Sequence, residues 1–115
     1  MILEISEATP SLNRFVWRHW SHYAKLKKRW VKLIWAARVQ VHPAAPTPIE
    51  NARVVIERYS KHELDTDNAV GGCKCVVDSL RSNNLIVDDD PQHLTLTVTQ
   101  HVSNKPHTII RLAPA

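Results

Sequence analysis

The chain has 115 residues and a net charge of +4, which is enough length for one domain with a single buried core. Its 43% apolar and 23% charged residues are ordinary for a globular protein, and seven prolines with two glycines do not suggest a low-complexity linker. No run approaches the roughly 18 apolar residues of a membrane helix, and the amino terminus has neither the basic nor the apolar region of a secretory signal. We therefore expect one domain over residues 1–115, acting in the cytoplasm without a membrane partner.

The charges are divided unevenly along the chain. Residues 8–49 contain no acidic residue, whereas aspartates gather at Asp65, Asp67 and Asp78 and in the run 88–90. Basic surface attracts phosphate, and clustered carboxylates repel it unless a cation lies between them. This combination is typical of a metal-dependent nuclease. The basic residues expected to contact DNA are Arg14, Arg18, Lys25, Lys27, Lys28, Arg29 and Lys32.

The first half of the chain predicts a strand and a long basic helix. Residues 2–5 read as a short strand, which Pro10 and Ser11 interrupt. From residue 16 to residue 40, apolar side chains recur at three- and four-residue steps with lysines and arginines between them, which predicts an amphipathic helix. The proline-rich segment 42–48 ends that helix, because proline cannot continue it.

The second half predicts three strands and a second helix. Residues 52–59 alternate and are rich in β-branched side chains, as in a strand. A helix is predicted over residues 68–82, followed by strands at 94–99, where apolar residues alternate with threonine, and at 107–112. The order β-α-β-α-β-β predicts an α+β domain with a mixed sheet and two helices packed on one face.

The segment Asp65-Thr66-Asp67-Asn68 lies where the chain enters the second predicted helix. Two carboxylates one residue apart in extended chain point the same general way, which suits a hard cation. Alternatively, Asp67 caps the helix amino terminus, a position that Asp, Asn and Ser often fill.

The second predicted helix aligns several polar residues on one side. In a continuous helix Asp67, Gly71, Lys74 and Asp78 lie within roughly 60° of one another. Gly71 and Gly72 are the chain's two glycines, and each costs a helix about 1 kcal/mol relative to alanine. We interpret them as positions where a substrate backbone or a second subunit approaches closely; a tight internal contact or a late helix start is the alternative.

Three adjacent carboxylates, Asp88, Asp89 and Asp90, precede the alternating strand. Such a run is most often a solvated loop. Mg²⁺, however, is commonly held by one or two carboxylates together with substrate phosphate and water. One of these aspartates completes the metal site if the strand that follows runs beside Asp65.

The cysteines and histidines do not predict a metal site. Cys73 and Cys75 form a C-x-C pair without the paired spacings of a zinc site, and they are too close together to staple a fold. We interpret both as ordinary thiols on a helix face. His19 and His22 are one helical turn apart, but solvated or phosphate-facing histidines are the commoner case.

Residues 65–89 read D-T-D-N-A-V-G-G-C-K-C-V-V-D-S-L-R-S-N-N-L-I-V-D-D. They resemble the D-x-D-N…K…D-x-L…V-D-D signature of RusA-type Holliday junction resolvases. The similarity is greatest to the phage and prophage versions, which carry a G-G pair before the lysine. Residues 10–13, P-S-L-N, resemble the P-S-x-N element of the same family, and the basic helix that follows is similar in character. The resemblance covers residues 9–112. Two departures are the seven-residue step from Asp67 to Lys74 and the third consecutive aspartate, Asp90.

The resemblance implies a homodimer of α+β subunits that cleaves four-way DNA junctions symmetrically with Mg²⁺, for which Mn²⁺ can substitute, and no small-molecule substrate. Asp65, Asp67 and Asp89 match the metal-binding aspartates, and Lys74 matches the catalytic lysine; Asp88 and Asp90 stay open as alternatives to Asp89. The residues in supporting roles are Asn68, Gly71, Asp78 and Asp88.

Other functions stay open. A degenerate resolvase would bind junctions without cutting them, and a non-catalytic nucleic-acid-binding protein would use the same basic helix with aromatic side chains stacked on bases. A helix lying on a membrane surface is disfavoured by Pro43 and by the strands that follow. Helical spacing favours core positions for Trp30 and Trp20 over stacking. The tryptophans available for stacking are Trp17, Trp20, Trp30 and Trp35.

Overall fold

The computed structural model describes residues 1–16 and 18–115. Trp17, one of the candidate stacking tryptophans, lies outside the described residues. The elements along the chain are β1 (Ile2–Ile5), the 3₁₀ helix η1 (Leu12–Arg14), α1 (Trp20–Val41), β2 (Ala52–Ser60), α2 (Thr66–Gly72), α3 (Lys74–Ser82), β3 (Leu94–Val102) and β4 (His107–Pro114).

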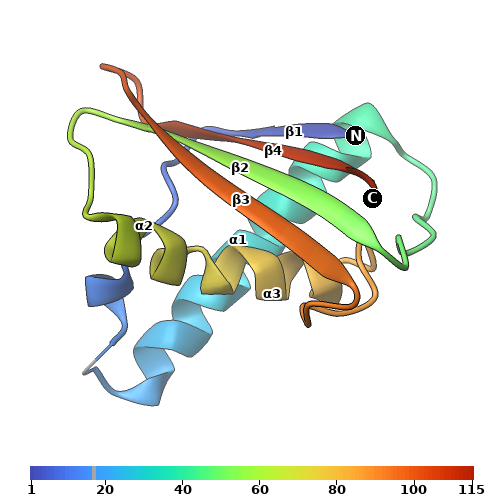
Figure 1. The fold of residues 1–115 in the computed structure, drawn as a ribbon, viewed down its shortest axis with the longest axis horizontal. Helices are drawn as coiled ribbons and strands as arrows, with labels where there is room; N and C mark the ends of the chain where they lie inside the picture. The colour runs from blue at the N-terminus through green and yellow to red at the C-terminus, as the bar shows by residue number, and fades with distance from the viewer. Residues whose placement is uncertain (17) are drawn as a thin grey trace.

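The four strands form one mixed sheet in the order β1-β4-β2-β3 (Figure 1). β4 pairs antiparallel with both β1 and β2, whereas β2 and β3 are parallel. Parallel neighbours require a crossover, which α2 and α3 supply between β2 and β3. The predicted α+β class with a mixed sheet is confirmed.

The helices lie on one face of the sheet, as predicted (Figure 1). Alternate residues of β2 and β4 face them and are buried, while the residues between are exposed or half-buried. The radius of gyration is 13.4 Å, close to the roughly 13 Å expected of a single domain of this length. No helix among the described residues is long and apolar enough to span a bilayer. The centre of the core is formed by Trp30, Ile34, Val54, Ile56, Val76, Leu80 and Ile110.

The basic helix begins at Trp20, later than the predicted residue 16. The His19 side chain accepts a hydrogen bond from the Ser21 backbone N–H and so caps the helix. Before it, the chain forms η1 and tight backbone turns, among them the bond from Val16 N–H to the Leu12 carbonyl. Periodicity cannot separate such turns from the first turn of a helix, because both place apolar residues three or four apart.

The second predicted helix is interrupted at Cys73, so the continuous helix assumed from the sequence is wrong. The Cys73 N–H bonds to the Val70 carbonyl in a tighter turn, and a new helix begins at Lys74. Asp67 and Gly71 therefore do not share one helical stripe with Lys74 and Asp78. Lys74 and Asp78 remain one turn apart on α3, whereas Asp67 and Gly71 belong to α2.

Both glycines are explained by internal packing. A side chain on Gly72 would collide with the backbone carbonyl of Pro10, and one on Gly71 would lie 3.0–3.2 Å from the Leu12 side chain. The close approach comes from the chain's own segment around η1 rather than from a substrate or a second subunit. Arg58 of β2 anchors that segment, because its buried side chain donates a hydrogen bond to the Thr9 carbonyl at 2.9 Å.

Candidate functional site

Asp65 and Asp67, separated by Thr66, lie at the start of α2, and both are exposed. Asp65 is the N-cap residue but its side chain makes no capping hydrogen bond, and Asp67 lies in the first turn. The alternative that Asp67 is the N-cap is therefore wrong. No residue that the structure describes donates a hydrogen bond to either carboxylate, so the oxygens of both carboxylates are available to an external ligand. The half-buried Asn68 follows them in the same turn.

The segment that presents these carboxylates is anchored to β3. The backbone N–H and carbonyl of Leu64 both bond to the side-chain amide of Gln100, each at 2.8 Å. This paired contact fixes the chain one residue before Asp65. Sequence reasoning missed Gln100, because nothing local relates it to a residue 36 positions earlier.

Lys74 belongs to a small network with Asp78 and Tyr23. The Lys74 ammonium lies 3.3 Å from Asp78 Oδ2 and 5.5 Å from the centre of the Tyr23 ring. The Tyr23 hydroxyl, on α1, donates to the same Asp78 oxygen. Burial and the bond to Asp78 raise the pKa of Tyr23 well above its usual value, so the hydroxyl stays protonated and continues to donate. The Asp78 side chain is 11% exposed and that of Lys74 61% exposed. The lysine ammonium therefore contacts a nearly buried carboxylate while most of its side chain is open to solvent.

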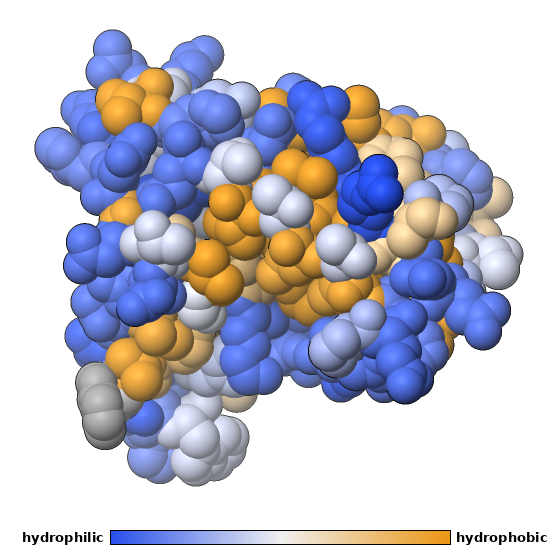
Figure 2. All heavy atoms as spheres, viewed as in Figure 1, coloured by the Kyte–Doolittle hydropathy of each residue, from blue (hydrophilic) through white to orange (hydrophobic). Residues whose placement is uncertain are grey.

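Lys74 and Asp89 line one groove of about 300 Å³. Its walls are apolar side chains of α2, α3 and the start of β3: Val70, Cys73, Val77, Pro91, Leu94 and Leu96. Figure 2 shows the corresponding apolar area at the centre of this face, over β3 and the α2–α3 helices. Lys74 and Asp89 therefore line the same mostly apolar, solvent-open groove, although 15 positions separate them along the chain.

The three consecutive aspartates have different environments. Asp88 accepts from the Asp89 backbone N–H at 2.8 Å and pairs with Arg81 at 3.1 Å, and these contacts hold the pKa of its carboxyl below the usual value. Asp90 accepts from the backbone N–H groups of Gln92 and His93 and lies 2.8 Å from the His93 ring, so it organises the turn into β3. Asp89 is the one that lines the groove; its nearest cation, Arg81, is 3.8 Å away.

The three aspartates expected to bind metal are not gathered into a cluster. Among residues 1–16 and 18–115, no three His, Cys, Asp or Glu side chains lie close enough together to form a metal-binding group. Leu64, just before Asp65, bonds to Gln100 near the end of β3, whereas Asp89 precedes the start of that strand, so the structure does not place Asp89 beside Asp65. The carboxylates of Asp65 and Asp67 are of the kind that Mg²⁺ takes, together with substrate phosphate and water.

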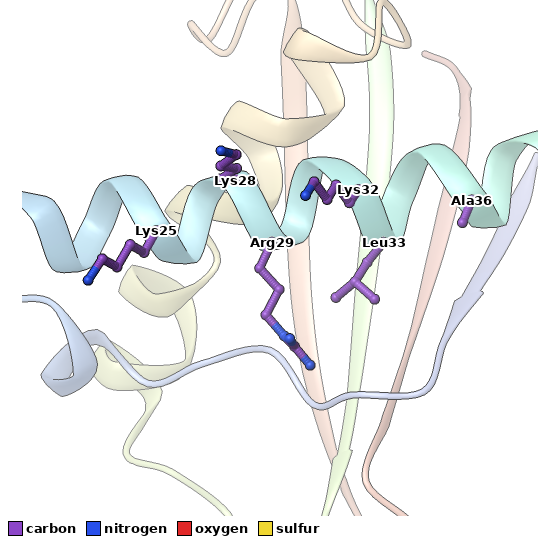
Figure 3. Close-up of a pocket in the computed structure, with 6 residues that line it drawn as sticks. All are labelled: Lys25, Lys28, Arg29, Lys32, Leu33 and Ala36. Atoms are coloured by element: carbon purple, nitrogen blue, oxygen red, sulfur yellow. The ribbon is translucent and has the colours of Figure 1, made fainter.

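Most of the expected DNA-contacting residues are exposed. Lys25, Lys28, Arg29 and Lys32 line one groove of about 500 Å³ along α1 (Figure 3). A second groove beside it adds Arg14 and His22. Arg18 is exposed, whereas Lys27 is half-buried against α3, where its carbonyl lies 3.5 Å from the Ser79 hydroxyl. Arg29 forms an ion pair with Glu7, which lies in the segment after β1.

The remaining aromatic and thiol predictions have mixed outcomes. Trp30 is in the core at 1% exposure, as expected, but Trp20 is 74% exposed, so its core assignment is wrong. Cys73 and Cys75 are buried and free. Burial raises the pKa of Cys73 to about 11 and that of Cys75 to about 12, so both are protonated, unreactive thiols.

The Tyr23–Asp78 bond is testable by stability alone. Tyr23→Phe keeps the ring and removes the hydroxyl, leaving a buried carboxylate with one donor fewer; we expect the free energy of unfolding to fall by about 1.5–3 kcal/mol. Tyr59→Phe is the matched control, because Tyr59 is stacked between His101 and His107 through its ring. Urea unfolding measures both. Equal effects in the two variants would show that the hydroxyl contributes nothing specific.

No protein-family model matches the chain, and a search of curated proteins returned no match.

Proposed function

We propose that this chain is a Mg²⁺-dependent endonuclease of the RusA type that resolves four-way DNA junctions in the cytoplasm during recombination and repair. The observation that carries the proposal is that Lys74 and Asp89 line one groove. Both belong to the sequence motif, although 15 positions separate them along the chain. Asp65 and Asp67 add further support, because their carboxylates pair with no described residue and lie at the start of α2, which lines the same groove through Val70.

The proposed reaction is hydrolysis of a phosphodiester by in-line attack of water. Asp65 and Asp67 would hold Mg²⁺, or Mn²⁺ in its place, and the resemblance assigns Asp89, in the groove lined by Lys74, to the metal as well. When bound, the cation supplies charge for the leaving oxygen and lowers the pKa of bound water. Lys74 offsets negative charge developing on the phosphate oxygens.

The chain's own side chains prepare Lys74 for this role. Asp78 keeps the ammonium oriented and is itself held by Tyr23, so the lysine does not need to find its position when the substrate arrives. The exposed lysines of α1 hold backbone phosphates without reading bases, which makes binding strongly salt-dependent.

We further propose that the protein acts as a homodimer. A four-way junction contains two symmetric scissile strands, and a two-fold dimer presents two identical sites to them. A monomer would nick one strand. Light scattering of the purified chain, with and without junction DNA, measures the assembly directly.

The test is cleavage of an end-labelled synthetic four-way junction with Mg²⁺, with a linear duplex of the same sequence as control. We expect paired symmetric cuts on the junction, no cutting of the duplex and no cutting with EDTA. Asp67→Asn should bind the junction like the wild type and cut it at least about 100-fold more slowly, since a metal-binding carboxylate is lost. Junction binding without cutting by the wild type would reject the enzyme.

The second candidate is a protein that binds branched DNA without cutting it. It is favoured by one observation: the basic grooves of α1 are fully formed, whereas the described carboxylates do not make a ready metal cluster. It predicts junction binding that is indifferent to Mg²⁺ and unchanged in Asp67→Asn.

A further inference from the structure

Two tryptophans on α1 are left outside the core. Trp35 is 55% exposed and Trp20 is 74% exposed, in a chain whose other described tryptophan, Trp30, is 1% exposed. The helix already buries an apolar stripe against the sheet and α3, so these two rings are not needed for packing. Single exposed apolar side chains are ordinary on protein surfaces, but tryptophan is enriched at binding interfaces, because its ring is apolar and its N–H is polar.

Two exposed lysines lie between the exposed tryptophans along the helix, closer to Trp35 than to Trp20: they are roughly 80° and 120° around the axis from Trp20. Trp20 and Trp35 are fifteen residues apart, or about 22 Å along the axis, and roughly 60° apart around it. Lys28 and Lys32 lie between them, both exposed and within roughly 60° of Trp35. We call this set, Trp20, Lys28, Lys32 and Trp35, the α1 outer stripe.

The charges of the α1 outer stripe are not neutralised within the chain. α1 contains no acidic residue. Of the carboxylates that reach the helix from outside, Asp78 accepts from Tyr23, and Glu7 pairs with Arg29, which lies on the side facing the segment after β1 (Figure 3). Lys28 and Lys32 make no ion pair with any residue that the structure describes. The stripe therefore offers free cations beside free aromatic faces.

We propose that the α1 outer stripe binds unpaired nucleotides, with Trp35 stacking on a base and Lys28 and Lys32 on the flanking phosphates. Aromatic rings interleaved with lysines are the arrangement by which proteins hold single strands, because every base has a face to stack and every phosphate a charge to pair. In duplex DNA the base faces are covered by their neighbours, so Trp35 distinguishes open strands from closed ones.

A membrane surface fits the stripe less well. An interfacial helix needs a continuous apolar face to bury in the lipid. The continuous apolar face of α1, formed by Leu26, Trp30, Ile34 and Ala37, is buried in the domain. On the outer side, lysines separate the two tryptophans, which suits a chain of alternating bases and phosphates.

This inference deepens the proposed function, on which it rests for the identity of the natural substrate: the branch point of a junction interrupts the stacking of bases where its arms meet. The binding event itself requires neither metal nor cleavage. It can therefore be measured separately, and its failure is distinguishable from failure of the nuclease proposal.

The experiment titrates fluorescently labelled oligothymidylate, which forms no duplex, with the full chain in EDTA, following anisotropy and tryptophan quenching. We expect saturable binding with quenching for the wild type and an affinity about tenfold lower or more for Trp35→Ala. Trp35→Phe, which keeps a ring, should stay within about threefold of wild type. Lys28→Gln should reduce the slope of log affinity against log salt by about 0.7.

Val102→Ala is the matched control, since Val102 is an apolar side chain 70% exposed on β3 rather than on α1. It should bind like the wild type. Unchanged affinity in Trp35→Ala would overturn the inference, as would a duplex of equal length showing the same dependence on Trp35. Loss of binding to phosphatidylserine vesicles in Trp35→Ala, with oligothymidylate binding intact, would assign the stripe to a membrane and overturn it as well. Trp35-dependent binding by a chain that cuts no junction would support the inference and reject the nuclease.

Discussion

Asp89→Asn is expected to slow junction cleavage by about 100- to 1,000-fold while leaving junction binding within about twofold of wild type. The variant keeps the size of the side chain and removes its charge, and Asp89 is the aspartate of the 88–90 run that lines the groove with Lys74. Losing a carboxylate there removes a charge needed while the phosphodiester breaks, which affects the rate rather than the affinity. Single-turnover cleavage at saturating protein separates the two.

The neighbouring aspartates provide controls on the same loop. Asp88→Asn loses a solvent-exposed ion pair with Arg81. Such pairs contribute little to stability, so this variant should cleave within about threefold of wild type. Asp90→Asn weakens the turn into β3, because Asp90 accepts from Gln92 and His93, so a modest loss of stability should exceed its effect on rate. A larger loss of cleavage in Asp88→Asn than in Asp89→Asn would move the metal ligand to Asp88 and contradict the assignment from the groove.

Gly72→Ala is expected to lower the free energy of unfolding by about 3 kcal/mol, and the melting temperature by roughly 10 °C. Helix propensity alone would favour alanine by about 1 kcal/mol, so the sign of the effect reports on packing. The added methyl group meets the Pro10 backbone carbonyl and the Ser11 backbone, with no flexible side chain to move aside. The segment cannot retreat freely, since Arg58 holds the Thr9 carbonyl and Thr108 holds that of Glu7.

Gly71→Ala is the paired control for this effect. Its methyl group would meet the end of the Leu12 side chain at 3.0–3.2 Å, and a leucine can adjust its rotamer. We expect a change within about 1 kcal/mol in either direction. Thermal and urea unfolding of the two variants measure the difference. If Gly72→Ala were as stable as the wild type, the contact between α2 and the Pro10 segment would not be a fixed part of the fold.

Much of the fold was predictable because its signals are local. The alternation of Leu94, Leu96 and Val98 with threonines identified β3, and the spacing of Leu26, Trp30 and Ile34 identified α1. The errors fell where local signals are ambiguous. Helical spacing could not show that residues 12–16 form turns before α1, or that the second helix breaks at Cys73.

The candidate site was predicted by residue identity rather than by arrangement. Asp65, Asp67, Lys74 and Asp89 were selected from spacing and resemblance, and the structure shows which of them share a surface. Lys74 and Asp89 line one groove. No local pattern reveals that the Tyr23 hydroxyl reaches a carboxylate 55 residues away.

By itself, the sequence determined the α+β class, the approximate element boundaries, the acid-free basic helix and the set of chemically capable aspartates, since each depends on neighbours along the chain. The tertiary structure alone decided the order β1-β4-β2-β3, the approach of Gly72 to Pro10, the Tyr23–Asp78–Lys74 network, and the exposure of Trp20 and Trp35. These features join residues far apart in the chain. They follow from how one shared core is packed, and packing is a property of all the elements together.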